Sequence, residues 1–178
     1  MKKIVLVLVC VSMSFLSFTE KDKEVTTTQE KNIVEVAVGN ENFSTLVAAL
    51  KAADLVGVLS GTNEFTVFAP SNDAFNKLPK GTVESLLKPE NKDALTDILM
   101  YHVVAGEYKA AAVVKAIKDN GGKFSVNTVK GEKITLMMDG NNVVIKDAKG
   151  GKSVIIMTDV DASNGVIHAV GSVLMPKE

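Results

Sequence analysis

The chain has 178 residues, of which 46% are hydrophobic and 23% charged, a balance typical of globular proteins. A chain of this length can bury roughly two thirds of its unfolded surface, so we expect one domain with a substantial core. The net charge is −1 and every basic residue is Lys, which argues against a nucleic-acid-binding surface.

The N-terminus has the pattern of a secretory signal peptide. Lys2 and Lys3 precede the apolar run 4–18, which is shorter than the ~20 residues needed to span a bilayer. We therefore predict that residues 1–19 are a signal peptide and that the mature protein is secreted, periplasmic or attached to the cell surface. Such a start on a compact single-domain protein is typical of bacteria.

Cys10 is the only cysteine and leaves an alternative open, in which a lipid on its sulfur anchors the protein to a membrane. Val9 is bulkier than the residue that usually precedes a lipidated cysteine, so an apolar position within the signal peptide is the favoured interpretation. Once the signal peptide is removed, the domain can form neither a disulfide nor a thiolate metal site.

Residues 20–31 predict a disordered polar leader, because Val25 is their only apolar residue. Helical periodicity then dominates the first half of the domain, which we place at residues 32–176. We expect helices after Asn32, Ser44, Ser71, Thr82, Asn91 and Lys109, with Ser44, Ser71, Thr82 and Asn91 as N-caps. One early strand, 65–69, interrupts the helices and ends at Pro70.

After Gly121 and Gly122 the apolar period changes to two, which predicts meandering antiparallel strands. Their alternating apolar or β-branched positions are 124, 126 and 128, then 134, 136 and 138, then 143 and 145, then 154 and 156. The pair Asn164 and Gly165 predicts a type I′ hairpin turn before a last strand. Helices followed by strands indicate an α+β fold.

Three stretches resemble the motifs of the fasciclin domain family, in the order and spacing of that family. They are Thr66–Phe75, Ile98–Val104, and Asn164–Val170 together with Val173–Pro176. The resemblance covers about residues 32–176 and implies a wedge of two crossed, mostly antiparallel sheets flanked by several short helices. The matching residues that we interpret as structural are Thr66, Phe68, Pro70, Asn72, Phe75, Asn164, Gly165 and His168.

The search for catalytic, cofactor or metal residues is negative. His102 and His168 are the only histidines, and each lies in an apolar pattern, which favours buried imidazoles with satisfied hydrogen bonds. The carboxylates Asp147, Asp159 and Asp161 hint at a cation site, but they lack calcium-loop spacing and are interpreted as solvated. We therefore expect no enzyme activity, no cofactor and no metal.

Function is implied mainly by the resemblance, since fasciclin proteins are mostly non-enzymatic adhesion and matrix-contact proteins. In periostin-like members an acidic residue followed by isoleucine, and a tyrosine followed by histidine, are implicated in integrin recognition. The matching residues are Asp97 and Ile98, and Tyr101 and His102. They are candidates for binding an extracellular or cell-surface protein or glycan, although we expect His102 to be structural and Asp97 to be more exposed.

An alternative function is a carrier of an apolar small molecule such as a carotenoid or lipid, because some fasciclin-fold proteins bind carotenoids. Pigment or lipid that co-purifies with the protein would favour this alternative. In either case we expect a monomer that contacts a membrane only if Cys10 is lipidated.

The first prediction is that residues 1–19 are absent from the mature protein, because signal peptides are cleaved on export. Mass spectrometry of the exported form measures this directly. An intact N-terminus on the exported protein would contradict the prediction, and a lipid-sized mass increase on Cys10 would support the lipoprotein alternative.

Overall fold

The computed structural model describes residues 31–79 and 81–177, so the predicted signal peptide and almost all of the predicted leader lie outside the described residues. The α-helices are α1 (Ile33–Val38), α2 (Ser44–Ala52), α3 (Val56–Leu59), α4 (Asn72–Asn76), α5 (Thr82–Leu86), α6 (Lys92–Tyr101) and α7 (Ala110–Asp119). The strands are β1 (Phe65–Pro70), β2 (Val103–Ala105), β3 (Lys123–Asn127), β4 (Lys133–Asp139), β5 (Asn142–Lys146), β6 (Lys152–Ala162) and β7 (Gly165–Val170). Single 3₁₀ turns precede α2 and α6.

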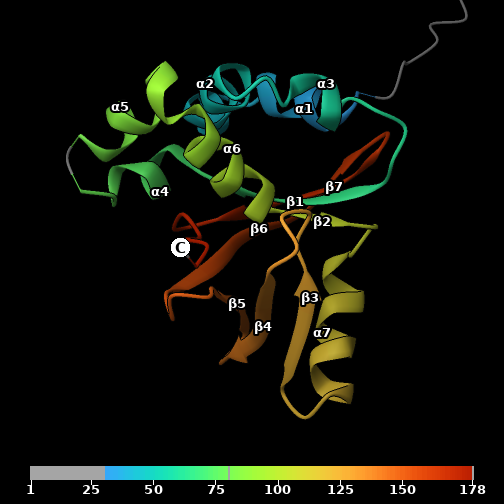
Figure 1. Ribbon diagram of the computed structural model, residues 1–178. Coiled ribbons are helices and arrows are strands. Elements are labelled where there is room, and N and C mark those ends of the chain that lie inside the picture. The colour runs from blue at the N-terminus through green and yellow to red at the C-terminus, as the bar shows by residue number, and fades with distance from the viewer. Residues whose placement is uncertain (1–30, 80, 178) are drawn as a thin grey trace, which may run out of the picture.

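The strands form one mixed sheet in the order β2-β1-β7-β6-β5-β4-β3. All neighbours are antiparallel except β1 and β7, which run parallel from Phe65 opposite Gly165 to Pro70 opposite Val170. The long strand β6 belongs to both halves of the sheet, because it pairs with β5 at one end and with β7 at the other. In Figure 1 β1 and β7 run across the view while β3 and β4 run down it. The predicted α+β fasciclin-like fold is confirmed, with its two halves joined through β6 into one seven-stranded mixed sheet.

Two apolar cores occupy the two halves of the molecule. Helices α1 to α6 cover the β1–β7 half, as the upper part of Figure 1 shows, and their buried side chains meet Phe65, Val67 and Ile167 of the sheet. Helix α7 lies along β3 and packs Val113 and Ile117 against the β3–β5 half. Among the described residues no helix is long and apolar enough to cross a membrane.

The helix caps agree only in part with the sequence predictions. Ser71 caps α4 as predicted, since its hydroxyl accepts a hydrogen bond from the Ala74 amide. Ser44 is instead the first residue of α2, and the orphan amide of Thr45 donates to the side-chain oxygen of Asn72, 3.0 Å away. The α2 cap therefore comes from a distant segment, which local sequence reasoning could not find.

Thr82 and Asn91 also do not cap their helices with a side chain. Gly81 occupies the N-cap position of α5 in a left-handed conformation, φ +86°, that favours glycine. The Asn91 side chain turns away from α6 and donates to the carbonyl of Ser85, 2.8 Å away.

Strand β6 does not bury its predicted apolar positions. Ile156 is 60% exposed and Val154 is also exposed, whereas Ser153 between β5 and β7 is buried. The physical reason is a hydrogen-bond pair, because the Ser153 hydroxyl donates to the Ser172 carbonyl and accepts from the Ser172 amide. The Ser153 side chain therefore faces inward, and because side chains alternate along a strand, Lys152 and Val154 face outward.

The predicted β6–β7 hairpin exists, but the predicted type I′ turn at Asn164 and Gly165 is wrong. Ala162 pairs with Gly165, so the turn residues are Ser163 and Asn164, and neither has a positive φ. Gly165 has φ +142°, and a Cβ there would lie 1.9 Å from the Phe65 carbonyl oxygen. Glycine is thus required by the close approach of β7 to β1.

We predict that Gly165→Ala lowers the free energy of unfolding by more than about 3 kcal/mol, because a methyl group has no space beside the β1 backbone. The matched control is Gly140→Ala, where φ is also positive at +61° but no atom lies within 4 Å of the new Cβ. Its expected cost is only about 1 to 2 kcal/mol, from the left-handed backbone. Equal costs in urea denaturation would contradict the steric explanation.

Candidate functional site

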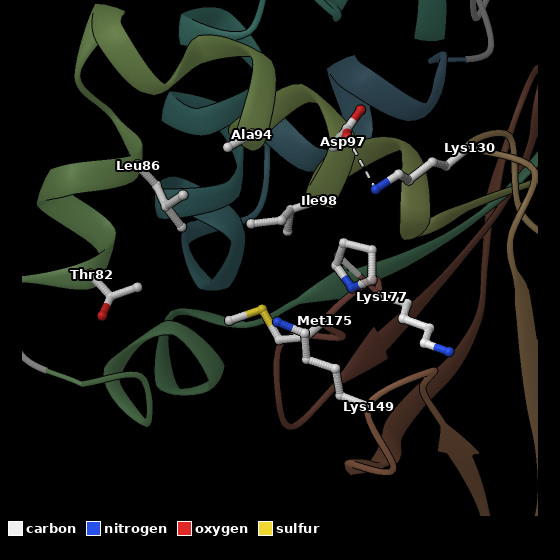
Figure 2. Close-up of a pocket in the computed structure, with 10 residues that line it drawn as sticks. Thr82, Leu86, Ala94, Asp97, Ile98, Lys130, Lys149, Met175 and Lys177 are labelled. Carbon is white, nitrogen blue, oxygen red and sulfur yellow. Dashed lines mark ion pairs between the residues drawn. The ribbon is translucent and has the colours of Figure 1, made fainter.

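A groove of about 370 Å³ lies between helices α5 and α6 and the C-terminal segment. Figure 2 shows Ala94, Asp97 and Ile98 of α6 on one side, with Met175, Lys149 and Lys177 on the other. Its lining residues are Thr82, Leu86, Ala94, Asp97, Ile98, Lys130, Lys149, Met175, Pro176 and Lys177. Half of these residues are apolar, and the charged ones are one aspartate and three lysines.

Asp97 and Ile98, two of the predicted partner-binding residues, lie on the α6 wall of this groove. The Asp97 side chain is 55% exposed, and its carboxylate pairs with the Lys130 ammonium at 3.0 Å. Lys130 also lies 3.3 Å from Glu132. Its hydrogen bond to Asp97 raises the pKa of Lys130 above the ordinary value for lysine. Ile98 is half-buried and adds apolar surface next to the ion pair.

Tyr101, the third predicted partner-binding residue, is fully buried, and its side chain cannot meet a partner. Its hydroxyl donates to the Lys133 carbonyl at 3.3 Å and accepts from the Ala148 amide at 2.9 Å. Burial raises the pKa of Tyr101 and keeps the phenol neutral. This residue therefore fastens the start of β4 and the β5–β6 turn to the end of α6.

His102, the fourth, is also buried and holds the C-terminal segment in place. Its Nδ1 lies 2.7 Å from the Ile98 carbonyl oxygen, and its Nε2 lies 2.9 Å from the Leu174 amide. A carbonyl only accepts and an amide only donates, so Nδ1 carries the proton and the ring is neutral. Loss of solvation on burial lowers the pKa of His102 to about 4.

Two carboxylates complete the attachment of the C-terminal segment. Asp147 accepts from the Met175 amide at 3.1 Å and from the Gly151 amide at 2.6 Å, and Glu132 accepts from the Lys177 amide at 2.9 Å. The interpretation of Asp147 as a solvated carboxylate is thus wrong, because the side chain is buried. Asp147 and Glu132 act as structural acceptors behind the groove wall.

The other two carboxylates of the suggested cation site are exposed, and each contacts the start of α7. Asp159 accepts from the Ala110 amide at 2.8 Å, at the start of α7, and Asp161 pairs with Lys109 at 3.2 Å. Within residues 31–79 and 81–177, no group of three or more His, Cys, Asp or Glu side chains is placed to hold a metal ion.

His168 lies away from the groove and organises the loop before α7. Its ring stacks on Phe68 with 5.7 Å between centroids, its Nε2 donates to the Tyr108 carbonyl, and its Nδ1 accepts from the Asp159 amide. Thr66 holds the same loop, since its hydroxyl accepts from the Tyr108 amide at 2.8 Å. These motif residues thus make contacts within the fold.

The remaining motif residues lie at junctions between elements. The side-chain oxygen of the buried Asn164 accepts from the Ile33 backbone amide. Its side-chain nitrogen donates to the carbonyls of Leu59 and Gly61. Pro70 is the last residue of β1, and Phe75 of α4 is buried in the helical core.

Sequence reasoning missed the cationic side of the groove. Lys130 and Lys149 both lie in turns, but nothing in their local sequence indicates that the two turns meet beside α6. Lys177 and Met175 follow the last strand and reach the groove only because His102, Asp147 and Glu132 hold their backbone.

Comparisons with known proteins agree on one family. A family model of the Fasciclin domain matches residues 41–176. Protein sll1483 of Synechocystis sp. is 50% identical over 169 residues, which cover 93% of this chain and 87% of that protein. Pig transforming growth factor-beta-induced protein ig-h3 is 33% identical over 86% of this chain, which spans only 20% of that longer protein.

A solved structure shares the fold. It is a FAS1 domain pair from the insect cell adhesion molecule fasciclin I, with a TM-score of 0.73 and 20% sequence identity. The alignment covers 82% of this chain and 51% of that one, which corresponds to one of its two domains.

The next prediction concerns pH and His102. Below pH 6.5 the unfolded chain protonates this histidine, whereas the folded state keeps it neutral until about pH 4, so stability falls as the pH falls. Between pH 7 and 5 we expect His102 to cost about 2 kcal/mol of unfolding free energy. Urea denaturation of His102→Gln should show lower stability at pH 7 but a shallower loss between pH 7 and 5. If the unfolding free energies of the two proteins fall in parallel between pH 7 and 5, the lowered pKa of His102 is contradicted. Above pH 7.5 the difference between the two free energies should be constant.

Proposed function

Because the chain belongs to the fasciclin domain family, we propose that it is a secreted, periplasmic or cell-surface interaction domain that binds an extracellular or cell-surface protein or glycan without catalysis. The solved structure that shares its fold comes from a cell adhesion molecule, fasciclin I, which supports this class of function. We propose that the domain acts as a monomer and that it contacts a membrane only in a form lipidated at Cys10, which lies outside the described residues.

The observation that carries the proposal is the division of α6 into two faces. Asp97 and Ile98 line an open groove, whereas Tyr101 and His102 lie behind it and bond to the main chain. An exposed carboxylate beside a half-buried isoleucine offers a partner both a polar and an apolar contact, as protein interfaces commonly do. We therefore assign partner contact to Asp97 and Ile98, and a supporting role to Tyr101 and His102.

The surroundings of the titratable groups support a function without catalysis. Both ring nitrogens of His102 and of His168 are engaged by the main chain, so neither imidazole is placed to exchange a proton with a substrate. The buried carboxylate Asp147 is likewise occupied by two amides.

A second candidate function, a carrier of an apolar small molecule, is favoured by the groove itself. Leu86, Ile98, Met175 and Pro176 give it apolar walls, and its volume of about 370 Å³ falls in the range of small-molecule sites. A carotenoid-like or lipid-like molecule would lie with its apolar part along these walls.

The adhesion proposal predicts that Asp97→Ala weakens binding to intact cells of the source organism at least fivefold, because a charged contact of the partner is lost. The loss of the Asp97–Lys130 pair should change the unfolding free energy by less than about 1 kcal/mol, since the pair lies at the surface. Flow cytometry with the fluorescently labelled mature domain measures the binding.

The matched control is Asp93→Ala, which removes an exposed carboxylate one turn earlier on α6, outside the groove lining. This variant should bind as the unmodified protein does. If folded Asp97→Ala and Ile98→Ser also bind normally, the α6 wall is not the partner-binding surface.

A further inference from the structure

A group of lysines occupies the outer face of strands β3 to β6, on the side away from α7. Each of these strands contributes one lysine, and we call this surface the cationic sheet face after its lysines, Lys123, Lys133, Lys146 and Lys152. We propose that it binds an acidic polysaccharide. The proposal adds a second binding surface to the α6 groove, because none of these lysines lines that groove.

The other face of these strands is covered by a helix. Ile134, Leu136 and Ile145 are buried there together with Ile117 of α7, which lies beside β3 in Figure 1. Because side chains alternate along a strand, the lysines of the cationic sheet face point to the opposite side. All of them are exposed, so this face is open to a partner.

These lysines have no counter-charge within the part of the chain that the structure describes. Among residues 31–79 and 81–177 none of them forms an ion pair, although the whole chain carries a net charge of −1. In β3, β4 and β5 the only acidic residue is Asp139, at the end of β4. The face therefore presents an excess of positive charge, which attracts a polyanion and raises its local concentration.

Two of the lysines stand where like charges repel each other. Lys146 of β5 is the direct partner of Lys152 of β6 in the antiparallel register. The Cβ atoms of such a pair are about 4.5 to 5.5 Å apart, and like charges at this spacing are destabilising. An anionic group bound between the two ammonium groups replaces this repulsion with two attractions. The register therefore makes this pair the centre of the proposed site.

Hydroxyl groups continue the line that these two lysines begin. Lys146 lies opposite Thr135 of β4 in the register, and Thr135 lies opposite Ser125 of β3. The two hydroxyl oxygens are 3.1 Å apart, and a hydroxyl can both donate and accept hydrogen bonds. With adjacent strands about 4.8 Å apart, the line from β6 to β3 is about 14 Å long. It offers charged and neutral hydrogen-bonding groups along the path of one extended polymer.

An apolar strip runs beside this line. Met137 of β4, Val144 of β5 and Val154 of β6 lie opposite one another in the register, two residues along each strand from the line. Val154 is 41% exposed and Met137 is half-buried. A sugar ring carries both hydroxyl groups and apolar C–H faces, so a polysaccharide that bonds to the line can also cover this strip.

The composition of the face favours a glycan over a protein. The centres of protein interfaces are enriched in aromatic residues and depleted in lysine. Here every strand carries a lysine, whereas Phe124, the only aromatic residue of β3 to β6, packs in the core with α7. Lysine is a point charge on a flexible stem, which suits carboxylate or sulfate groups spaced along a polymer.

Polygalacturonate and dextran sulfate are the probes, one with carboxylates and the other with sulfates. Methyl-esterified polygalacturonate and dextran are their uncharged counterparts. Biolayer interferometry with the immobilised polymers and the purified exported protein measures the affinities. At least one acidic polymer should bind at least tenfold more tightly than its uncharged counterpart, and the pair that shows this difference identifies the anionic group. If neither acidic polymer binds, the proposal is overturned.

The double variant Lys146→Gln, Lys152→Gln should weaken binding of the acidic polymer at least tenfold. Its melting temperature should equal or exceed that of the unmodified protein, because the change removes a repulsion. A lower melting temperature would contradict the repulsion on which the proposal rests. The double variant Lys123→Gln, Lys133→Gln tests the same face from β3 and β4, and it should weaken binding at least threefold.

The matched control is Lys115→Gln, Lys118→Gln, which makes the same change in net charge on α7, where both lysines are exposed. This variant should bind the acidic polymer as the unmodified protein does. Equal losses in the control and in Lys146→Gln, Lys152→Gln would mean diffuse attraction to charge and would overturn the proposal.

Poly-L-glutamate distinguishes a glycan from an acidic protein, because it has the charge without the sugar rings. It should bind at least fivefold more weakly than the acidic polysaccharide. Equal binding would overturn the glycan assignment in favour of an acidic protein partner. The adhesion proposal is tested separately by the cell-binding assay with Asp97→Ala, so the failure of one proposal is distinguishable from the failure of the other.

Discussion

The close contact between β7 and β1 constrains most of the structure. At Gly165 the two backbones approach so nearly that no side chain fits, and this contact fixes the parallel register along the whole of β1. The register in turn places His168 opposite Phe68, and the buried Asn164 ties the same corner to α1 and to the segment before β1. A parallel pair joins segments about 100 residues apart, so both halves of the chain must be present before this corner can form.

The candidate site depends on that framework through α6. Two neighbouring surfaces lie at the C-terminal end of this helix. Tyr101 and the C-cap residue His102 bond inward, to a strand carbonyl and to the C-terminal segment. Asp97 and Ile98, one turn earlier, line the groove. Tyr101 and His102 hold the backbone on the opposite side of the groove, through the amides of Ala148 and Leu174. A tyrosine-histidine motif can thus influence recognition without touching the ligand, by holding the backbone that carries Met175 and Lys149.

Much of the fold could be predicted from the sequence, because strand and helix periods, the Ser71 cap and the α+β order are local properties. The α2 cap by Asn72 and the inward Ser153 could not, since each depends on a partner far along the chain. The exposed role of Asp97 followed from its position on α6, whereas the cationic wall did not. Lys130, Lys149 and Lys177 come from three separate segments that only the folded sheet brings together.

The Asn72 side chain has a consequence for the order of events in folding. Its oxygen accepts from the Thr45 amide and its nitrogen donates to the Glu41 carbonyl, so the start of α2 is completed by a residue of α4. Isolated helices of this length are marginal in water, and this one lacks a cap from its own sequence. Helix α2 and the β1–α4 connection should therefore gain hydrogen-exchange protection together, as one cooperative unit, rather than one after the other.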